Sequence, residues 1–314
     1  MQLIVSDSHD PFLNLAYEYE LLNRAVESES FLFIYRNNPC VVIGRFQNPW
    51  KELKFSKMSN DIKFVRRHSG GGTVYHDLGN WNFSFIKPGT KINEIENLNI
   101  ITNALAEYGI NAQINERFDI VINADDSLKK ISGSAFRRVR YAHLHHGTLL
   151  FDANLTSLKG LLGKDRCFNI EDKGVASVPS QVLNLSELDT ALNFDLFLMT
   201  LQEQLGVPLQ VLSSDESTDL TLHHYNTLTS WAWQWGQGPK AKFEIKGESG
   251  IGLSFDLANG QFENVFYKSI DGEIMSLAGL NGQKIMDISL SSQSSTIPDA
   301  KLLELFTLNF CCRL

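Results

Sequence analysis

Two spacings of apolar residues divide the chain into helical and extended segments. Amphipathic helices are predicted where apolar side chains recur every three or four positions; these segments are 11–25, 94–108 and 188–205. Short apolar or alternating runs bounded by Asn, Gly and Pro predict strands; these are 1–7, 31–35, 40–43, 64–67, 81–86, 118–123, 130–140 and 142–153. In the run at 81–86 aromatic and polar residues alternate, which predicts a half-buried strand. Runs of strands with helices between them predict an α+β domain on a mixed or antiparallel sheet.

A change in composition at residues 236–239 predicts a boundary between a large domain over 1–237 and a small one over 238–314. The small domain is expected to hold three strands and a helical or mixed tail; these cover 243–245, 251–257, 262–270 and 300–310. Three tryptophans just before the boundary are expected to pack at the domain junction rather than to stack on a base; they are Trp231, Trp233 and Trp235.

Composition narrows the class of protein. Of 314 residues, 43% are hydrophobic and 20% charged, which is typical of a globular protein, and no apolar run approaches the ~18 residues of a membrane span. The net charge of −8 argues against broad contact with nucleic acid. No basic stretch followed by an apolar one begins the sequence, so a cytoplasmic location is expected. Cys40, Cys167, Cys311 and Cys312 form no C-x-x-C pair and are expected to be reduced thiols.

The most unusual stretch places two arginines before three consecutive glycines. Arg66 and Arg67 precede Ser69, and glycines at 70–72 follow. Glycine reaches positive φ at no steric cost, so such a turn can point several successive N–H groups at one anion. The alternative is a flexible hairpin turn with a solvated arginine pair. A phosphate-binding loop is favoured because two further unusual stretches, 129–135 and 145–150, accompany it.

A lysine and two hydroxyls are expected to share one face of the strand predicted at 130–140. Side chains alternate across a strand, so Lys130, Ser132 and Ser134 project to the same side. A lysine there can hold its charge against a phosphate and a carbonyl oxygen at once. Lys130 is therefore the candidate catalytic residue, and the structural alternative is an exposed edge lysine. Lys129 points the other way and is expected to be solvated.

Three motifs, in this order, resemble those of the lipoate-protein ligases and the related lipoyltransferases. They are Arg-Arg-x-Ser-Gly-Gly-Gly-x-Val-Tyr-His-Asp-Leu-Gly-Asn at 66–80, Lys-Ile-Ser-Gly-Ser-Ala at 130–135 and His-His-Gly-Thr-Leu-Leu at 145–150. Further similarity lies at 6–11, 14–16, 41–52 and 230–237. The resemblance therefore spans roughly residues 5 to 238, and an ordered set of motifs is more specific than any one of them.

The resemblance implies the α+β fold shared by lipoate-protein and biotin-protein ligases, with a large mixed-sheet catalytic domain and a small C-terminal α/β accessory domain. It implies that ATP, with Mg²⁺, activates lipoate to lipoyl-AMP. The lipoyl group then passes to a lysine of an apo lipoyl domain of a 2-oxoacid dehydrogenase E2 subunit or of the glycine-cleavage H protein. Adenylate formation brings two negatively charged groups together, so cationic side chains and N–H donors lower its barrier.

The resemblance also implies which residues bind the ligands. The positions matching the family's nucleotide-binding residues are Arg67, Gly72, Thr73, Val74, Tyr75 and Lys130. Lys130 also matches the residue that contacts the acyl carbonyl. The further candidates are Ser69, Gly70, Gly71, His146 and Asp119. Asp119 could bind Mg²⁺, orient Lys130 or form a buried ion pair. His145 and His146 face opposite sides of a strand and cannot share a metal, so one is expected to be a hydrogen-bonded core or loop residue and His146 to line the pocket.

One departure from the bacterial ligases keeps other functions open. Where they carry Arg-Asn-Asp-Leu, this chain has Arg-Phe-Asp-Ile at 117–120, and Phe118 supplies neither the donor nor the acceptor of an asparagine. In this respect the chain resembles the animal lipoyltransferases. A transferase that uses preformed lipoyl-AMP or a lipoylated carrier is therefore an alternative. An alternative of another class is a non-catalytic scaffold that binds lipoylated proteins.

Overall fold

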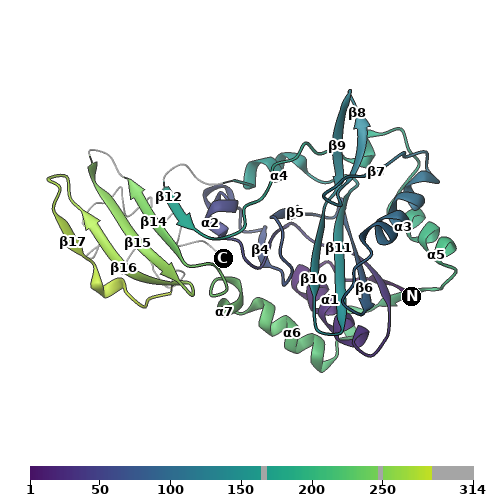
Figure 1. The fold of residues 1–314 in the computed structure, drawn as a ribbon, viewed down its shortest axis with the longest axis horizontal. Coiled ribbons are helices and arrows are strands. Elements are labelled where there is room, and N and C mark those ends of the chain that lie inside the picture. Colours follow the sequence, from purple (N-terminus) through teal and green to yellow (C-terminus); the bar gives the residue numbers. More distant parts are fainter. Residues whose placement is uncertain (164–167, 247–249, 285–314) are drawn as a thin grey trace.

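A computed structural model describes residues 1–163, 168–246 and 250–284 (Figure 1). The largest sheet within them has six strands in the order β10 (Ser134–Arg138), β11 (Ala142–Leu150), β6 (Asn80–Pro88), β2 (Phe31–Arg36), β1 (Gln2–Ser6) and β13 (Leu209–Leu212). Strand β1 pairs in parallel with β2 and β13, and the other neighbours are antiparallel. The sheet is mixed, as predicted. The tail expected at 300–310, Cys167, Cys311 and Cys312 lie outside the described residues.

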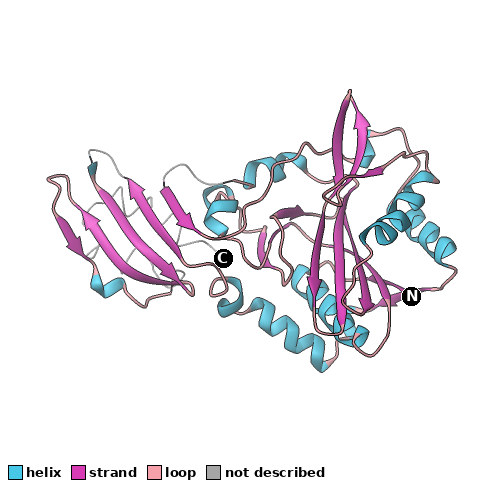
Figure 2. Ribbon diagram, viewed as in Figure 1, coloured by secondary structure: helices cyan, strands magenta, loops and turns pink. Residues whose placement is uncertain are grey.

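Helices cover both faces of this sheet, as the helices coloured cyan in Figure 2 show. Helix α1 (Pro11–Ala25) packs on one face, where its Tyr17 meets Phe33 in an apolar cluster. Helices α3 (Glu94–Ala106) and α5 (Phe194–Leu205) pack on the other face. Both faces of the central strands are therefore buried, and the sheet has a hydrophobic core on each side.

Strand β6 is buried on both faces, so the expectation of a half-buried strand is wrong. Its aromatic side chains point into the core beneath α3 and α5; they are Trp81, Phe83 and Phe85. The alternating polar residues Asn82 and Ser84 are only 3% and 0% exposed because helix α1 covers their face. Ser84 donates its hydroxyl to Glu18 Oε1 of that helix at 2.6 Å. Strand β6 therefore places polar side chains in the interior of the protein, where they can form hydrogen bonds.

Two three-stranded sheets flank the glycine-rich loop and hold Lys130. One consists of β4 (Lys63–Arg66), β3 (Cys40–Ile43) and β5 (Val74–His76). The other consists of β7 (Gln113–Ile114), β8 (Ile120–Ala124) and β9 (Ser127–Ser132). The segment expected as one strand over 130–140 is divided at Gly133, because β9 pairs with β8 whereas β10 joins the large sheet.

The C-terminal part of the described chain forms an antiparallel sheet. Its strands are β12 (Phe168–Asp172), β14 (Ala241–Lys246), β15 (Gly252–Ala258), β16 (Gln261–Lys268) and β17 (Ile274–Ser276). The three strands predicted here correspond to β14, β15 and β16, and a turn at Asn259-Gly260 joins the last two. Strand β12 comes from earlier in the chain and pairs with β14. The division of the chain at residues 237 and 238 stays a prediction.

The remaining helices connect these layers; they are α2 (Pro49–Glu52), α4 (Leu155–Leu161), α6 (Asp219–Thr229) and α7 (Trp231–Gln234). Trp235 stacks on Phe64 with 4.6 Å between ring centroids and shares a core cluster with Phe243 of β14. Trp231 packs against the same cluster, whereas Trp233 lies 4.0 Å from His68 between ring centroids. Two of the three tryptophans therefore lie where the C-terminal sheet meets the rest of the chain, as expected.

Candidate active site

Two adjacent cavities lie beside the glycine-rich loop, and Lys130 borders both. Their volumes are about 330 Å³ for the first and about 550 Å³ for the second, within the range of small-molecule sites. The walls that they share include Thr73, Val74, Thr148 and Ser177. A ligand in each cavity would therefore meet the other beside one lysine.

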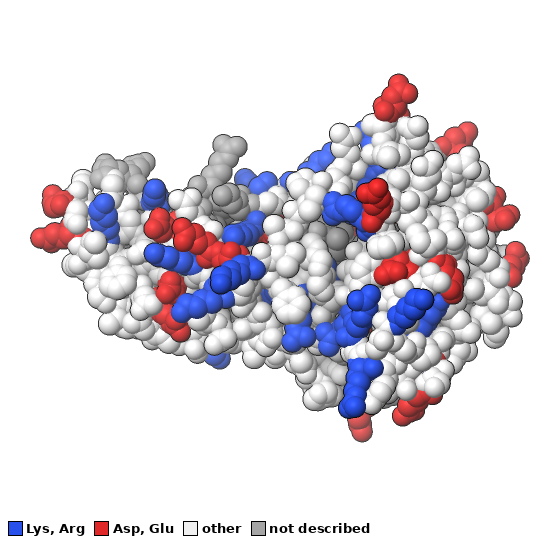
Figure 3. All heavy atoms as spheres, in the orientation of Figure 1, with Lys and Arg blue, Asp and Glu red and all other residues white. Residues whose placement is uncertain are grey.

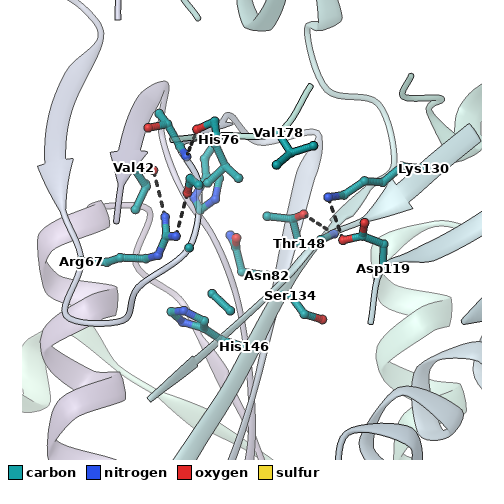
Figure 4. A pocket seen from close by; sticks show the side chains of 18 of the residues that line it. Val42, Arg67, His76, Asn82, Asp119, Lys130, Ser134, His146, Thr148 and Val178 are labelled. Atoms are coloured by element: carbon teal, nitrogen blue, oxygen red, sulfur yellow. Dashed lines mark hydrogen bonds and ion pairs between the residues drawn. The ribbon is translucent and has the colours of Figure 1, made fainter. Parts of the chain in front are cut away.

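The first cavity reaches from Lys130 to buried side chains of helix α1 and strand β2 (Figure 4). Its inner wall includes Leu15 and Tyr35, which are 4% and 2% exposed. Arg67 and His146 also line it, and both are buried. A long, narrow ligand could thus lie with its far end among buried side chains and its near end at Lys130.

The second cavity has a different lining. Three lysines border it, namely Lys51, Lys130 and Lys159. Six residues with hydroxyl groups also border it, namely Thr73, Tyr75, Ser132, Thr148, Ser177 and Ser180. Ammonium and hydroxyl groups bind phosphates and sugar hydroxyls. Apolar side chains also line this cavity, among them Leu150, Leu158 and Leu162, and can pack against a base. The lining therefore offers groups for each part of a nucleotide.

Arg67 builds the glycine-rich loop from inside. Its Nη2 donates to the carbonyls of Gly70 and Gly72 at 2.6 and 2.7 Å, and its Nη1 to Val42 O at 3.1 Å. Burial lowers the pKa of Arg67 to about 10, so the group is still a cation at neutral pH. Most of its donors are used by the protein, and its role is to shape the loop and to place positive charge beside the first cavity.

Arg66 points to the opposite side of the loop. Its guanidinium donates to the carbonyl of Gln234 and to three carbonyls of the neighbouring turn; these are Gly44 O, Arg45 O and Gln47 O. The solvated arginine pair considered as an alternative is therefore wrong, since Arg66 and Arg67 are 0% and 4% exposed. Buried guanidinium groups of this kind fix backbone conformation through their five donors.

A chain of hydrogen bonds joins helix α1 to the glycine-rich loop. Glu18 Oε1 accepts from His146 Nδ1 at 2.9 Å, and His146 Nε2 lies 2.7 Å from Ser69 Oγ. Arg67 Nε donates to the same Ser69 oxygen at 2.9 Å. Glu18 is 2% exposed and lies outside the motifs that defined the candidate site. The sequence signal that could have indicated Glu18 is a carboxylate at a position that the helical spacing assigns to the core.

Lys130 forms an ion pair with Asp119, with 2.8 Å between Nζ and Oδ1. Gly133 makes room for it, because a Cβ at that position would lie 2.9 Å from both Cε and Nζ of Lys130. Lys129 instead donates to Gln181 on the exposed side, as expected. The glycine of the Lys-Ile-Ser-Gly motif thus has a steric reason to be there.

The glycine-rich loop leaves backbone donors available. Gly71 has a φ of +86°, and the amides of residues 70–72 have no hydrogen-bond partner among the described residues. Thr73 N, in contrast, donates to Ser177 Oγ at 2.8 Å. Successive free amides in such a turn are the feature from which the sequence predicted an anion-binding loop.

The residues predicted from the sequence fall into groups around the cavities. Those that line only the first cavity are Arg67, Gly71, Gly72, Asp119 and His146. Those that line both are Thr73, Val74 and Lys130, and Tyr75 lines the second. Ser69 and Gly70 line neither. Ser69 is connected to the first cavity through His146 and Arg67. The roles proposed for these residues stay predictions.

The remaining motif histidines are buried and held neutral. Burial lowers the pKa of His145 to about 3, and its two ring nitrogens contact Asn97 and Ser134 at 3.2 and 3.0 Å. Burial lowers the pKa of His76 to about 3 as well, and its Nδ1 lies 3.0 Å from Asn37 Nδ2. His145 is thus the hydrogen-bonded core histidine that the sequence predicted beside His146.

A segment that the motifs do not include borders both cavities. Residues 175–178, called the roof segment below, line the first cavity, and 176–178 line the second. Ser177 Oγ accepts from the amide of Thr73 and from Gln47 Nε2 at 3.1 Å. Its hydroxyl donates to a carboxylate oxygen of Glu52. A loop without apolar periodicity gives no pattern from which this placement could have been read.

The surface carries a local group of positive charges. Lys and Arg side chains gather over β10 and β11 although the chain has a net charge of −8 (Figure 3). Within the described ranges, no three His, Cys, Asp or Glu side chains come together as a metal site. Among the same residues, no helix combines the length and the apolar character needed to cross a bilayer.

The chain matches the family described as the lipoyl protein ligase A/B catalytic domain over residues 10–206. This range is more than half of the chain, so the protein belongs to that family of lipoylation enzymes. The large mixed sheet with an antiparallel C-terminal sheet confirms the fold class expected from the sequence.

Solved structures with the same fold include several lipoate-protein ligases. LipL1 of P. falciparum in complex with lipoate is 26% identical, with a TM-score of 0.65 over 97% of each chain. A bipartite lipoate-protein ligase of Thermoplasma acidophilum, described with its E2 lipoyl domain, is 22% identical, with a TM-score of 0.60 over 74% of this chain and 95% of that one. A lipoate-protein ligase A bound with ATP is 23% identical, with a TM-score of 0.58 over 74% of this chain and 97% of that one.

Proposed function

We propose that this protein is a lipoate-protein ligase that activates lipoate with ATP and transfers the lipoyl group to a lysine of an acceptor protein. The observation that carries this proposal is the position of Lys130 at the junction of the two cavities. A reaction that joins an acyl chain to a nucleotide needs the two ligands in contact at a cation. The first cavity suits the acyl chain and the second suits ATP.

The first step would form lipoyl-AMP. A carboxylate oxygen of lipoate attacks the α-phosphorus of ATP, the bond to the β-phosphate oxygen breaks, and pyrophosphate leaves with the electron pair. Lys130 can contact both reacting groups and stabilise the charge that develops on them. Arg67 and the free amides of the glycine-rich loop add positive electrostatic potential beside the first cavity, which Lys130 also borders.

The second step would transfer the acyl group to the acceptor. A neutral lysine amine attacks the acyl carbonyl carbon, the C–O bond to the phosphate breaks, and AMP leaves. We propose apo lipoyl domains of 2-oxoacid dehydrogenase E2 subunits and the glycine-cleavage H protein as acceptors. The archaeal relative described with its E2 lipoyl domain supports the first of these.

Magnesium is proposed only as the ion that accompanies ATP. Asp119 is the carboxylate beside the lysine, but Lys130 Nζ lies 2.8 Å from its Oδ1 and Asn115 Nδ2 lies 3.5 Å from its Oδ2. One carboxylate paired in this way does not fit a protein site for Mg²⁺, which takes octahedral oxygen ligands. In the two steps proposed, the protein therefore acts through its side chains and backbone donors.

A lipoyltransferase that receives preformed lipoyl-AMP or a lipoylated carrier is the second candidate. Phe118 favours it, because the chain has this residue where bacterial ligases carry asparagine. Its ring packs against Phe136, with 5.9 Å between ring centroids, and it borders neither cavity. Phe118 thus contributes no group to the proposed ATP site, and the exchange assay described below distinguishes the two candidates. A cytoplasmic location remains a further proposal.

The test compares two activities of the purified protein. ATP–pyrophosphate exchange that depends on lipoate reports activation, and transfer from synthetic lipoyl-AMP to an apo lipoyl domain reports the second step. A ligase performs both, and Lys130→Ala loses both. Transfer without exchange would establish the transferase. Neither activity, with binding of lipoylated protein retained in Lys130→Ala, would establish the scaffold.

A further inference from the structure

A third hollow of about 370 Å³ opens onto the Lys130–Asp119 ion pair. Its walls come from the β7-β8-β9 sheet and from residues 180–181, and Leu128 at its edge is 58% exposed. Lys130 borders all three hollows, and Asp119 borders the first and the third. If the acyl chain and the nucleotide fill the first two, this hollow still gives access to the point where they meet.

Asp119 is held so that its carboxylate faces this point. The side chain of Asn115 accepts hydrogen bonds from the amides of Arg117 and Asp119, both at 2.9 Å, which fixes the turn before β8. Asp119 is 5% exposed, and its short contact is the one to Lys130. Lys130 also borders the proposed nucleotide cavity, so an anionic adenylate would compete with Asp119 for its ammonium group.

The acceptor lysine presents a proton problem that this arrangement answers. A lysine side chain is an ammonium group in water, and forming an amide from it releases two protons. One must leave before the nitrogen can attack, and the second leaves the nitrogen after the attack. A base within hydrogen-bond reach of the attacking nitrogen is needed for the second transfer.

We propose that the third hollow admits the side chain of the acceptor lysine and that Asp119 accepts the proton from its attacking nitrogen. This inference rests on the proposed ligase function. The first proton leaves to water as the lysine enters. The nitrogen then attacks the carbonyl carbon, AMP departs with the electrons of the broken C–O bond, and the second proton passes to Asp119. Asp119 returns it to water through the open hollow.

The decisive experiment uses Asp119→Asn, which keeps the size of the side chain. Lipoyl-AMP is supplied to the wild-type and variant proteins, with either an apo lipoyl domain or hydroxylamine as the nucleophile. Hydroxylamine nitrogen is a much weaker base than the lysine nitrogen, so after it attacks it loses the second proton to water without help from a catalytic base. Loss of a general base slows transfer to lysine by about 10²–10⁴-fold, and hydroxamate formation should fall much less. Equal loss with both nucleophiles would overturn the role of Asp119 as a base.

A second variant tests the hollow itself. The purified Leu128→Cys protein is divided into two portions, and one of them is labelled with a bulky maleimide. The wild-type protein is treated in the same way to control for its own cysteines. The label should abolish transfer to the lipoyl domain while exchange stays equal in the two portions. Unchanged transfer would refute the route. If the wild-type protein shows neither exchange nor transfer, the ligase function fails, and this outcome is distinct from both results above.

Discussion

Glu18 of helix α1 and His146 of strand β11 form a buried hydrogen bond of 2.9 Å, although they are 128 positions apart in the sequence. A carboxylate can only accept, so the network assigns the proton of a neutral His146 to Nδ1 and leaves Nε2 to accept from Ser69. The conformation of the glycine-rich loop is therefore connected to one tautomer of one histidine.

Glu18→Gln is expected to raise the KM for lipoate more than the KM for ATP. A glutamine amide can donate to Nδ1, which reverses the tautomer and makes His146 and Arg67 both donate to Ser69 Oγ. Loss of a buried hydrogen bond to a charged group costs about 1.5–3 kcal/mol, or roughly 10–100-fold in binding. Exchange kinetics with each substrate varied in turn measure the two KM values.

The control for this prediction is a double-mutant cycle. If Glu18 acts through His146, adding Glu18→Gln to His146→Gln should change the KM for lipoate little further. Additive effects of the two substitutions, or an equal rise in both KM values, would show that Glu18 has only a general structural role.

Gly133→Ala should lower kcat with little loss of stability. The added Cβ would lie 2.9 Å from the end of the Lys130 side chain, which can move but only by leaving its position against Asp119. We expect at least a roughly tenfold fall in exchange, equivalent to ~1.4 kcal/mol in the transition state. Gly160→Ala is the matched control, because a Cβ there meets nothing within 4 Å. Unchanged exchange in Gly133→Ala would contradict the steric argument.

Substitution of Phe118 should separate backbone strain from ATP binding. Phe118 has a φ of +60°, a conformation that asparagine adopts more readily than phenylalanine. Phe118→Asn should therefore relieve strain, lose the contact with Phe136, and change the free energy of unfolding by less than about 1.5 kcal/mol. Phe118→Val, which is β-branched, should destabilise the protein more. Denaturant unfolding measures both, and a large gain of exchange in Phe118→Asn would instead favour the transferase for the natural chain.

Stability should fall as the pH falls from about 6.5 to about 3. Burial lowers the pKa of His76 and of His145 from 6.5 to about 3. Between these values the unfolded chain binds protons that the native protein does not, so lowering the pH favours unfolding. His145→Gln should reduce the slope of unfolding free energy against pH by up to about one proton. An unchanged slope in that variant would show that His145 titrates normally.

The sequence predicted the elements whose signals are local. Helix α1 begins at Pro11, as predicted, and the side chain of Asp10 accepts from the amide of Phe12 at 2.8 Å. Helix α5 begins later than expected, at Phe194, because Asn193 caps it. Helix α6 was missed, since its apolar residues are sparse and two of its leucines, Leu220 and Leu222, are exposed.

In the candidate site, too, the residues in contiguous motifs could be predicted, and those that depend on contacts between distant segments could not. Lys130 and the glycine-rich loop could be found because their motifs are contiguous. Glu18 and Ser177 could not, because each reaches the site through contacts between segments far apart in the sequence. The burial of Asn82 likewise depends on helix α1 covering a strand whose own pattern indicates an exposed face.

Strand β12 should couple the candidate site thermodynamically to the C-terminal sheet. It is hydrogen-bonded to β14, and the chain that leaves it at Asp172 becomes the roof segment. Asp172 accepts from Lys51 Nζ at 3.0 Å and from Asn48 Nδ2 at 2.8 Å, which fastens this connection. Ligands that stabilise the roof segment should therefore slow amide hydrogen exchange in β12 as well. By reciprocity, removing β14 would weaken the binding of those ligands at a distance.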